Sequence, residues 1–428
     1  MNRTHALALA FALAFAASAC SDDGEAADAD TDTDTDTDTD TDTDTDTDSS
    51  TCDGHDPGTR ADTYPEDLNF HVGPYLMHTT TREVSISWET IASGSTRVEY
   101  GADESYGLSA DGDVGTMHQV TITGLEPETL YHYRACTAGT CTRDLTFATA
   151  PLPGASFRFA VLGDNRTYPD QHRDVIERML DARPDLVVNV GDIVTDGGNR
   201  EEYKIEYFDP SRPLGHLVPV YVSIGNHEVN SDNFRDYMMF PPGPEVDYPG
   251  TRTETSFSFT WGDVFFLIYD SNGLYAPVGE WKPERFLWLE QEVASEAAQR
   301  ARWRFAFMHH PPHCNCWEEG EAIGVREAVM PLLREHDFQA AFTGHTHDFE
   351  RLDVKGLLVY VTGGGGAGLE PIEECRDPVI PETQIYELVH HFLQIDIDCE
   401  QAAIQAIDVN GTLLDEVELG RDGSWTAK

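Results

Sequence analysis

The stretch that decides the fold is a series of five polar blocks between Asp164 and His347, each directly following an apolar run. With their leading runs they read FRFAVLGDNR (157–166), DLVVNVGD (185–192), VPVYVSIGNHE (218–228), WRFAFMHH (303–310) and AAFTGHTH (340–347). The runs have the length and the β-branched and aromatic composition of buried strands. Because open α/β sheets bind ligands at the carboxyl ends of their strands, we expect the five blocks to converge at one sheet edge.

The polar blocks concentrate two Asp, one Asn and several His at these strand ends. Carboxylate oxygen, amide oxygen and imidazole nitrogen together suit Zn, Fe or Mn better than a thiolate site would. A single histidine would indicate little, because a buried histidine is more often a hydrogen-bonded core residue. Five blocks in this order predict a site for two divalent or trivalent metal ions.

The series GD…GD…GNHE…HHPP…GHTH resembles the calcineurin-like metallophosphoesterases, and in particular their purple acid phosphatase branch. The resemblance covers residues 155–410 and implies an α/β metallophosphoesterase domain, expected over 151–428. The family fold is a pair of facing mixed sheets flanked by helices, with the metals at one end. The rest of the pattern agrees with the α/β class, because strand-like runs alternate with helical segments such as 170–183.

The resemblance also implies a role for each matching position. Asp164 resembles the carboxylate that binds only the first metal, and Asp192 resembles the carboxylate that bridges both metals. The remaining implied ligands are His347 for the first metal and Asn226, His309 and His345 for the second. His310 occupies the position next to a ligand, and we expect it to point elsewhere.

His227 resembles the family's acid beside the metals, which stabilises the transferring phosphoryl group or protonates the leaving oxygen. In such enzymes two cations acidify a bridging water, and the resulting hydroxide attacks the phosphorus in line with the leaving group. The implied reaction is hydrolysis of a small-molecule phosphate ester, with phosphomonoesters favoured. A phosphodiesterase or nucleotidase of the same fold is one alternative, and a surface binding lipoprotein without turnover is the other.

Two positions depart from the family pattern. Most metallophosphoesterases carry Asp-x-His in the first block, with the His on the first metal, where this chain has Arg166. Purple acid phosphatases carry a Tyr three residues after the second Asp, where this chain has Thr195. We therefore expect no purple colour, no obligatory ferric ion, and a first metal completed by water, by Asn165 or by substrate. Arg166 either grips phosphate oxygens or forms a structural salt bridge.

The first 20 residues are typical of an export signal. Arg3 and His5 precede the apolar run ALALAFALAFAA, which is too short to span a bilayer. The ending Ala17-Ser18-Ala19-Cys20 is similar to a bacterial lipobox, which would lipidate Cys20. The alternative is ordinary cleavage near Ala19, and either route predicts an exported protein.

Residues 21–62 form a predicted disordered linker. Thr-Asp repeats fill positions 31–48, and their like charges repel one another along the run. A calcium-binding repeat is the alternative to an extended spacer, but the run lacks the Gly turns and bidentate Glu of calcium loops. A spacer between the membrane and the folded part is the interpretation we favour.

Residues 63–150 predict an all-β domain, because segments such as VSISWET (84–90) and HQVTITGL (118–125) alternate apolar and polar residues. The stretch LEPETLYHY (125–133) is similar to the end of a fibronectin type III sandwich with its buried tyrosine, Tyr131, and Trp88 takes an inward-facing position. Such a sandwich precedes the catalytic domain in many purple acid phosphatases. Cys136 and Cys141 flank a short turn and are placed to form a hairpin disulfide.

The formal net charge of −49 argues against nucleic acid as a partner, because phosphate backbones select for basic surfaces. An anionic substrate must then be captured by local positive charge, which metal ions supply. The membrane is expected as a partner only through the lipid anchor at Cys20.

The loop His313-Cys314-Asn315-Cys316 directly follows the HHPP block. Disulfides are favoured over a third, zinc-type site, because exported proteins usually pair their thiols; a bond from Cys314 or Cys316 to Cys375 is one possibility. His313 either helps to bind substrate and protonate the leaving group or is a solvated loop residue. The glycines at 363–366 predict a close backbone approach to the metal site, and the run lacks the Lys of a nucleotide-binding loop.

Overall fold

The computed structural model describes residues 70–229, 231–238, 255–275, 283–398 and 400–428. The expected signal peptide, Cys20, the Thr-Asp linker, Cys52 and Cys399 lie outside these residues. No helix in the described ranges combines the length and the apolar character that crossing a membrane requires.

The N-terminal part is an antiparallel sheet that begins at Phe70. Its strands are β1 (Phe70–Met77), β2 (Glu83–Gly101), β3 (Leu108–Thr123), β4 (Leu130–Thr137), β5 (Thr140–Cys141) and β6 (Leu145–Ala148). The long β2 pairs with β1 through its first half and with β4 through its second half, while β3 pairs along both. This strand therefore organises the whole domain.

The core of this sheet confirms the predicted inward position of Trp88, but the prediction of Tyr131 as the buried tyrosine is wrong. Trp88 is fully buried, and its ring lies 5.0 Å from that of His118. Tyr131 is only partly buried, and its hydroxyl accepts a hydrogen bond from the Glu126 N–H at 2.9 Å; Tyr133 is the fully buried tyrosine of the strand. The turn after β4 is closed by the predicted Cys136–Cys141 disulfide.

The second part contains two seven-stranded sheets. The first has the order β20-β19-β18-β17-β7-β8-β9, in which β7, β8 and β9 are parallel and the C-terminal strands are antiparallel. Its strands are β7 (Phe157–Leu162), β8 (Leu186–Asn189), β9 (Val220–Val222), β17 (His391–Ile397), β18 (Gln401–Asp408), β19 (Leu413–Gly420) and β20 (Trp425–Ala427).

The second sheet has the order β10-β11-β12-β13-β15-β14-β16, with β11, β12, β13 and β15 parallel. Its strands are β10 (Phe257–Trp261), β11 (Val264–Ile268), β12 (Trp303–Phe307), β13 (Ala340–Thr343), β14 (Phe349–Val354), β15 (Leu357–Thr362) and β16 (Thr383–Glu387). Both sheets are mixed, which confirms the predicted fold class.

The two sheets face one another across an aromatic core. Phe159 of β7 lies 5.1 Å from Phe266 and 5.8 Å from Phe305 of the second sheet, measured between ring centroids. Burial of this apolar surface is the main force that holds the layers together.

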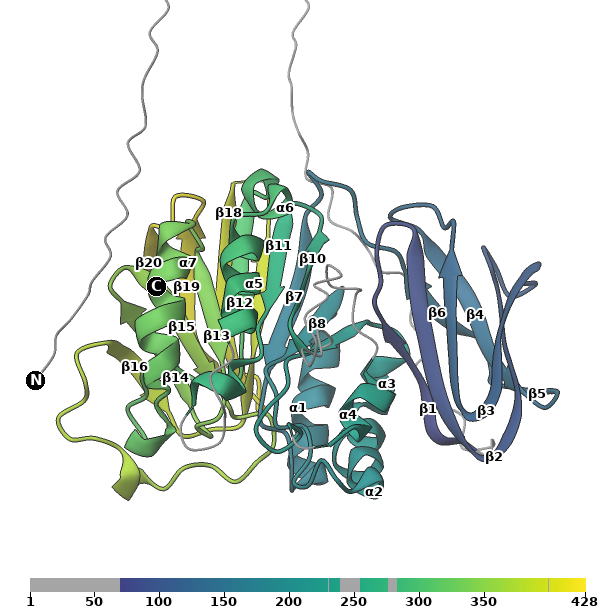
Figure 1. The fold of residues 1–428 in the computed structure, drawn as a ribbon, viewed down its shortest axis with the longest axis horizontal. Helices are drawn as coiled ribbons and strands as arrows, with labels where there is room; N and C mark the ends of the chain where they lie inside the picture. Colours follow the sequence, from purple (N-terminus) through teal and green to yellow (C-terminus); the bar gives the residue numbers. More distant parts are fainter. Residues whose placement is uncertain (1–69, 230, 239–254, 276–282, 399) are drawn as a thin grey trace, which may run out of the picture. The chain divides into compact units, whose positions relative to one another are not determined.

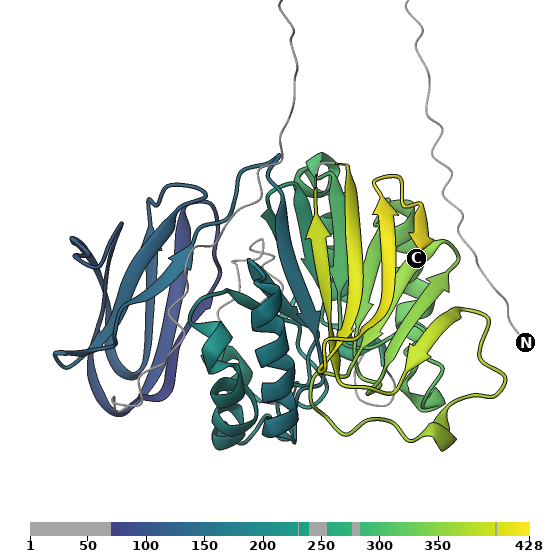
Figure 2. The same cartoon turned by 180° about the vertical axis from the view of Figure 1, so that it is seen from behind.

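Helices cover the outer face of the second sheet and part of the outer face of the first. In Figure 1, α5 (Pro283–Val293) and α7 (Met330–Glu335) lie in front of the second sheet, and in Figure 2 the C-terminal strands of the first sheet come to the front. The predicted helix is α1 (Pro169–Ala182), which packs its buried Val175, Ile176 and Met179 on the first sheet beside α3 (Asp209–Gly215). The shorter helices are α2 (Arg200–Glu202), η1 (Tyr203–Phe208), α4 (Asn233–Tyr237), η3 (Ser271–Leu274), α6 (Glu296–Arg300), η4 (Glu318–Gly320), η5 (Val325–Val329) and η6 (Ile372–Glu374).

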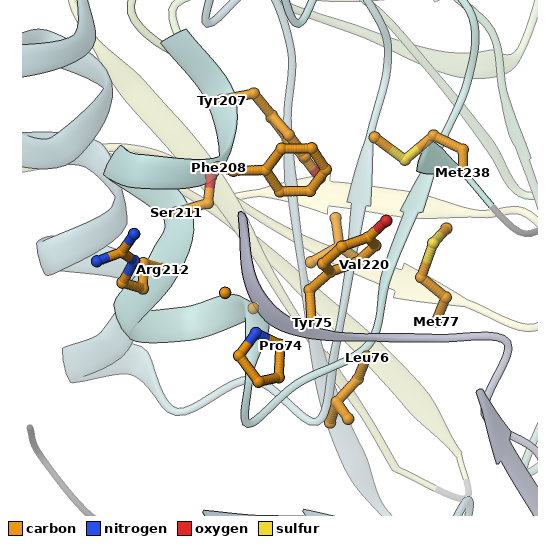
Figure 3. Close-up of a pocket in the computed structure, with 12 residues that line it drawn as sticks. Pro74, Tyr75, Leu76, Met77, Tyr207, Phe208, Ser211, Arg212, Val220 and Met238 are labelled. Atoms are coloured by element: carbon orange, nitrogen blue, oxygen red, sulfur yellow. The ribbon is translucent and has the colours of Figure 1, made fainter. Parts of the chain in front are cut away.

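The N-terminal sheet contacts the first sheet and its helices. The Tyr221 hydroxyl at the middle of β9 donates to the Thr79 carbonyl at 2.9 Å and accepts from the Thr79 N–H at 3.1 Å. Tyr75 of β1 packs on Phe208 and donates to the Tyr237 carbonyl at 2.6 Å. Figure 3 shows the small, mostly apolar pocket at this junction, lined by residues that include Pro74, Tyr75, Phe208, Arg212, Val220 and Met238.

Candidate metal centre

All five polar blocks lie after the carboxyl ends of strands, as the sequence predicts. Asp164, Asp192 and Asn226 follow β7, β8 and β9 of the first sheet. His309 and His345 follow β12 and β13 of the second. Asp164, Asp192 and His345 have φ angles of +55°, +54° and +74°. This left-handed conformation is unfavourable for residues other than glycine and is concentrated at functional sites.

Hydrogen bonds join the two sheet edges directly. The His309 Nδ1–H donates to the Val190 carbonyl of the first sheet at 2.9 Å. In return, the His345 N–H donates to Asp164 Oδ2 at 2.9 Å. Side chains from both sheets are therefore held in one small volume.

Glycines allow the backbone to come this close. A Cβ atom on Gly225 would lie 2.1 Å from Asp192 Oδ1, and one on Gly344 would lie 2.2 Å from Asp164 Oδ2. A Cβ atom on Gly363 would lie 2.0 Å from the Thr346 carbonyl oxygen. The predicted close approach of the 363–366 run is thus present, and side chains at these positions would displace the two carboxylates or their loops.

The arrangement around His309 leaves several lone pairs facing one another. Since Nδ1 must carry a proton to donate to a carbonyl, Nε2 of the neutral ring has only a lone pair. That Nε2 lies 3.0 Å from Asn226 Oδ1, 3.2 Å from His345 Nδ1 and 3.4 Å from Asp192 Oδ1. A cation at the centre of this cluster, either a proton or a metal ion, would be stabilised by these atoms.

The electrostatics of the metal-free site also favour a cation. Burial lowers the pKa of the His309 imidazole, but the carboxylates of Asp192 and Asp164 outweigh burial and bring the pKa to about 9. Burial acts to raise the pKa of Asp192, but His309 and then His227 hold it well below its usual range. Burial raises the pKa of Asp164 well above its usual range. The two carboxylates therefore favour a positive charge at His309, carried by either a proton or a metal ion.

The donor set fits a bound metal ion. Two buried atoms, Asp164 Oδ1 and His345 Nε2, have no hydrogen-bond partner in the described part of the chain, although buried polar atoms are normally paired. Ligand atoms of Asp164, Asp192 and His309 lie within 4.8 Å of one another, as do those of His309, His310 and His345. Carboxylate and imidazole ligands of this kind suit borderline metals.

The groups expected at the first metal are less well arranged. His347 Nε2 is 3.7 Å from Asp164 Oδ1, and its Nδ1–H donates to the Gly368 carbonyl at 2.7 Å. Arg166 lies between the two sides of the site, with Nε 3.6 Å from Asp192 Oδ2 and Nη2 3.4 Å from His347 Nε2. The structure therefore brings Arg166 into the centre, where it contacts both an expected bridging carboxylate and an expected ligand.

His310 lies closer to the centre than the sequence predicts. Its backbone N–H donates to Ser271 Oγ at 3.0 Å, and its Nδ1 lies 2.9 Å from the same oxygen. Its ring stacks on Tyr275 at 4.4 Å between centroids, and its Nε2 has no partner within the described residues. Burial lowers its pKa well below the usual range, so the ring is neutral. The only sequence signal was the doubled His of the HHPP block.

Glu228 is a second residue that the sequence analysis left without a role. Its buried carboxylate accepts hydrogen bonds from the N–H groups of Asp192 at 3.1 Å, Val194 at 3.2 Å and Gly225 at 2.9 Å. It thereby ties the Asp192 loop to the Asn226 loop. Burial, followed by the charge of Asp192, raises the pKa of Glu228 to about 8. The only indication of this role in the sequence was the position of Glu228 in the GNHE block.

The two predicted catalytic histidines lie in different surroundings. His227 is half-buried at the centre: its Nδ1–H donates to the Thr195 carbonyl at 2.6 Å, and its Nε2 is 3.7 Å from Asp192 Oδ2. His313 instead faces Glu321, with Nδ1 3.9 Å from Oε1, and belongs to neither of the ligand groups around His309.

Asn165, one of the options for completing the first metal position, is held by other parts of the fold. Its amide oxygen accepts from Asn189 Nδ2 at 2.8 Å, and its own Nδ2 donates to the Ile193 carbonyl at 3.1 Å. Thr195 stands where the family has its tyrosine, and its hydroxyl and N–H both donate to Glu206. Both side chains are committed to structural hydrogen bonds.

The cysteine loop beside the centre is closed by a disulfide between Cys316 and Cys375, separated by 59 positions in the sequence. Cys314 is a buried free thiol. Burial raises the pKa of the Cys314 thiol above its usual range, so it is not a thiolate. The disulfide prediction holds for Cys316, and the zinc-type alternative is wrong for these two paired sulfurs.

Two family models match the chain. Residues 157–349 match the calcineurin-like phosphoesterase family, and residues 71–149 match the purple acid phosphatase N-terminal domain. The chain therefore carries a calcineurin-like phosphoesterase domain preceded by a purple acid phosphatase N-terminal domain, and this family implies a dinuclear metal site.

The relatives found by sequence are distant purple acid phosphatases. Purple acid phosphatase 23 of Arabidopsis thaliana is 28% identical over 60% of this chain and 64% of its own length. Purple acid phosphatase 15 of the same plant is 27% identical over 62% of this chain and 56% of its own length. The chain thus spans less than two thirds of either relative. Two more distant relatives bear the name "Probable inactive purple acid phosphatase".

The fold agrees with a solved member of the same group. The purple acid phosphatase PPD1 from yellow lupin (Lupinus luteus) seeds superposes with a TM-score of 0.68, covering 82% of this chain and 75% of the lupin chain at 18% identity. The likeness at this identity shows the shared architecture of an N-terminal sheet and two mixed sheets.

Proposed function

We propose that this chain is an exported, metal-dependent phosphoesterase that hydrolyses small-molecule phosphate esters, phosphomonoesters in particular. The observation that carries this proposal is the convergence of ligand-type atoms of Asp192, Asn226, His309 and His345 on one buried point, where they would stabilise a cation. Two further features support the proposal: the left-handed backbone of Asp164, Asp192 and His345, and the glycines that leave no room for a Cβ atom. Backbone strain of this kind costs stability and is concentrated at functional sites.

The metal centre in this proposal is built on the predicted ligands Asp192, Asn226, His309 and His345. The other two predicted ligands, Asp164 and His347, lie at the position expected for a first metal. Zn, Fe or Mn fits such carboxylate, amide and imidazole donors. When bound, the metal supplies Lewis-acid activation of water and neutralises charge that develops on the phosphoryl group.

The chain's own residues then orient the substrate and manage protons. His227 is assigned as the acid for the leaving oxygen. Because its Nδ1–H is held by the Thr195 carbonyl, the proton that it transfers is the one its imidazolium form carries on Nε2, and the ring is left neutral. Arg166 is assigned to the phosphate oxygens, which its fork of N–H donors matches in geometry. Because the chain carries a net charge of −49, these local cations must overcome a repulsive background for an anionic substrate.

His313 is retained as a residue of the substrate rim. Its loop is adjacent to the HHPP block and is fixed by the Cys316–Cys375 disulfide. A His313→Gln variant tests this assignment: an unchanged KM and kcat would remove His313 from the proposal.

The proposal is tested by assaying the exported chain against an aryl phosphate monoester and diester after loading with Zn, Mn or Fe. Asp192→Ala should abolish turnover, while Asp181→Ala on the exposed face of α1 is the matched control and should have no effect. Turnover that survives in Asp192→Ala would refute the metal mechanism. Preference for the diester would favour a phosphodiesterase or nucleotidase.

A chain that folds and binds metal but hydrolyses neither ester would favour the second alternative, a binding lipoprotein. The presence of Arg166 in place of a ligand and the existence of relatives named as inactive are the observations behind that alternative.

We also propose export with lipid attachment at Cys20 as the route to the cell surface. The two disulfides and the homology to purple acid phosphatases support an extracellular location, since disulfides persist in oxidising compartments. Mass spectrometry of the mature N-terminus tests the anchor, and a diacylated Cys20 is the expected result.

A further inference from the structure

The first metal position does not fit a metal ion as well as the second does. It offers Asp164, His347 and a share of Asp192, and the guanidinium of Arg166 reaches into the same volume. Arg166 is only partly accessible, with 20% of its side chain exposed. Its backbone N–H donates to the Asp192 carbonyl at 3.3 Å, which anchors the residue beside that carboxylate.

A first metal would need a lone pair on the His347 ring, and the Arg166 guanidinium already lies against that lone pair. Because Nδ1 of His347 donates to the Gly368 carbonyl, the free lone pair is on Nε2. Arg166 Nη2 lies 3.4 Å from that Nε2. A metal at this position would have to displace the guanidinium from His347.

Charge opposes such a displacement. The guanidinium of Arg166 is a positive charge, and it repels an approaching metal cation. Asp192 Oδ1 lies 3.4 Å from His309 Nε2, on the side of the second metal position. The other oxygen, Oδ2, is therefore the one expected to serve the first position, and it lies 3.6 Å from Arg166 Nε. Two cations on one side of a buried carboxylate repel each other, and low solvent exposure reduces the screening of that repulsion.

The second position has no such competitor. In the described ranges, Asn226, His309 and His345 form hydrogen bonds or ion pairs with other site groups and with backbone, and none of these partners is a Lys or Arg. The two halves of the centre therefore differ in their readiness for a metal.

We propose that this chain binds one metal ion tightly, at Asp192, Asn226, His309 and His345, and that Arg166 supplies the second positive charge of the centre. This inference rests on the proposed function for its substrate but not for its metal count. The centre is then a metal–arginine pair, in which the guanidinium lies 3.6 Å from Asp192 Oδ2 and 3.4 Å from His347 Nε2.

Metal content of the full exported chain tests the inference without any activity assay. The chain is loaded with Mn²⁺, freed of excess metal by gel filtration, and measured by elemental mass spectrometry and electron paramagnetic resonance. One ion per chain with the spectrum of isolated Mn²⁺ is expected. Two ions per chain, or the spectrum of a coupled pair, would overturn the inference, as would a chain without metal.

Variants separate the two positions. Arg166→His should raise the content to two coupled ions, while Arg300→His, which makes the same change on the exposed end of α6, should leave it at one. His345→Ala should weaken the affinity about 100-fold, as loss of a ligand or its support does. His347→Ala should leave the affinity unchanged, and equal losses in the two histidine variants would contradict the proposal.

The two proposals fail in different ways. A chain that hydrolyses phosphate esters with two bound ions refutes the metal–arginine pair and leaves the proposed function intact. A chain that holds a single ion in the predicted position and hydrolyses nothing refutes the proposed function alone.

Discussion

Metal binding at His309 should release protons, and the count can be measured. In the metal-free protein the pKa of His309 is raised to about 9, because Asp192 and Asp164 outweigh the effect of burial. At neutral pH the ring therefore carries a proton on Nε2, the atom that faces Asn226 and Asp192. A metal that binds this Nε2 must displace that proton.

The size of the effect follows from this pKa. Below about pH 9, one displaced proton weakens the metal affinity by about tenfold for each unit of falling pH, hence about 100-fold between pH 8.5 and 6.5. His345 and His347 add no protons at neutral pH, because burial lowers the pKa of both below the usual range. Burial raises the pKa of Asp164 and Glu228, so these carboxyls can only add to the release.

Titration calorimetry with Mn²⁺ under anaerobic conditions, in buffers of different ionisation enthalpy, measures the protons released per ion. At least one proton per ion is expected at pH 7. His309→Gln should lose both the tight binding and the release, while His132→Gln, whose ring pairs with Asp144 in the N-terminal sheet, should behave like the parent chain. Binding at pH 7 without proton release would refute the reasoning about lone pairs around His309.

Three further predictions concern stability. Glu228→Ala removes the acceptor of three buried N–H groups and should lower the free energy of unfolding by about 3–5 kcal/mol, measured by chemical denaturation, with a smaller loss contradicting the bracing role. Burial lowers the pKa of both His172 and His391 to about 4, against about 6.5 in the unfolded chain, so the unfolded chain takes up protons first as the pH falls. The free energy of unfolding should therefore fall between about pH 6.5 and 4, by up to about 1.4 kcal/mol per pH unit for each histidine. His172→Gln should reduce that slope when unfolding is measured as a function of pH. Replacing Cys316 and Cys375 by Ser opens a loop of 59 residues and should cost about 2–4 kcal/mol, whereas an unchanged melting temperature would show that the loop is held by its other contacts.

The sequence predicted the parts of this molecule that depend on local pattern. The strands ahead of Asp164, Asp192 and His309 are short apolar runs with few alternatives, and their common direction follows from the α/β alternation. The inward position of Trp88 was likewise predicted from the alternation of apolar and polar residues. The Cys136–Cys141 disulfide was predicted from the spacing of the two cysteines. Such features need no knowledge of which segments meet in space.

What the sequence could not predict depends on partners distant along the chain. The hydrogen bond from Asn189 to the amide oxygen of Asn165 joins residues 24 positions apart, and the sequence does not indicate it. The proximity of His310 to the centre depends on Ser271 and Tyr275, which approach from another segment. Neither contact can be predicted from the local sequence pattern, because the hydrogen-bond partner of a buried polar side chain depends on which distant segment packs next to it.

The contact between Tyr221 and Thr79 gives the N-terminal sheet a protective role. Strand β9 is the last strand of its sheet and is only three residues long, so its outer side would otherwise offer unpaired backbone groups to other chains. The N-terminal sheet packs against this strand, and β9 leads directly to Asn226. A chain shortened to begin after residue 150 would expose that border, and we expect it to associate or to lose order at Asn226 even though every candidate ligand is still present.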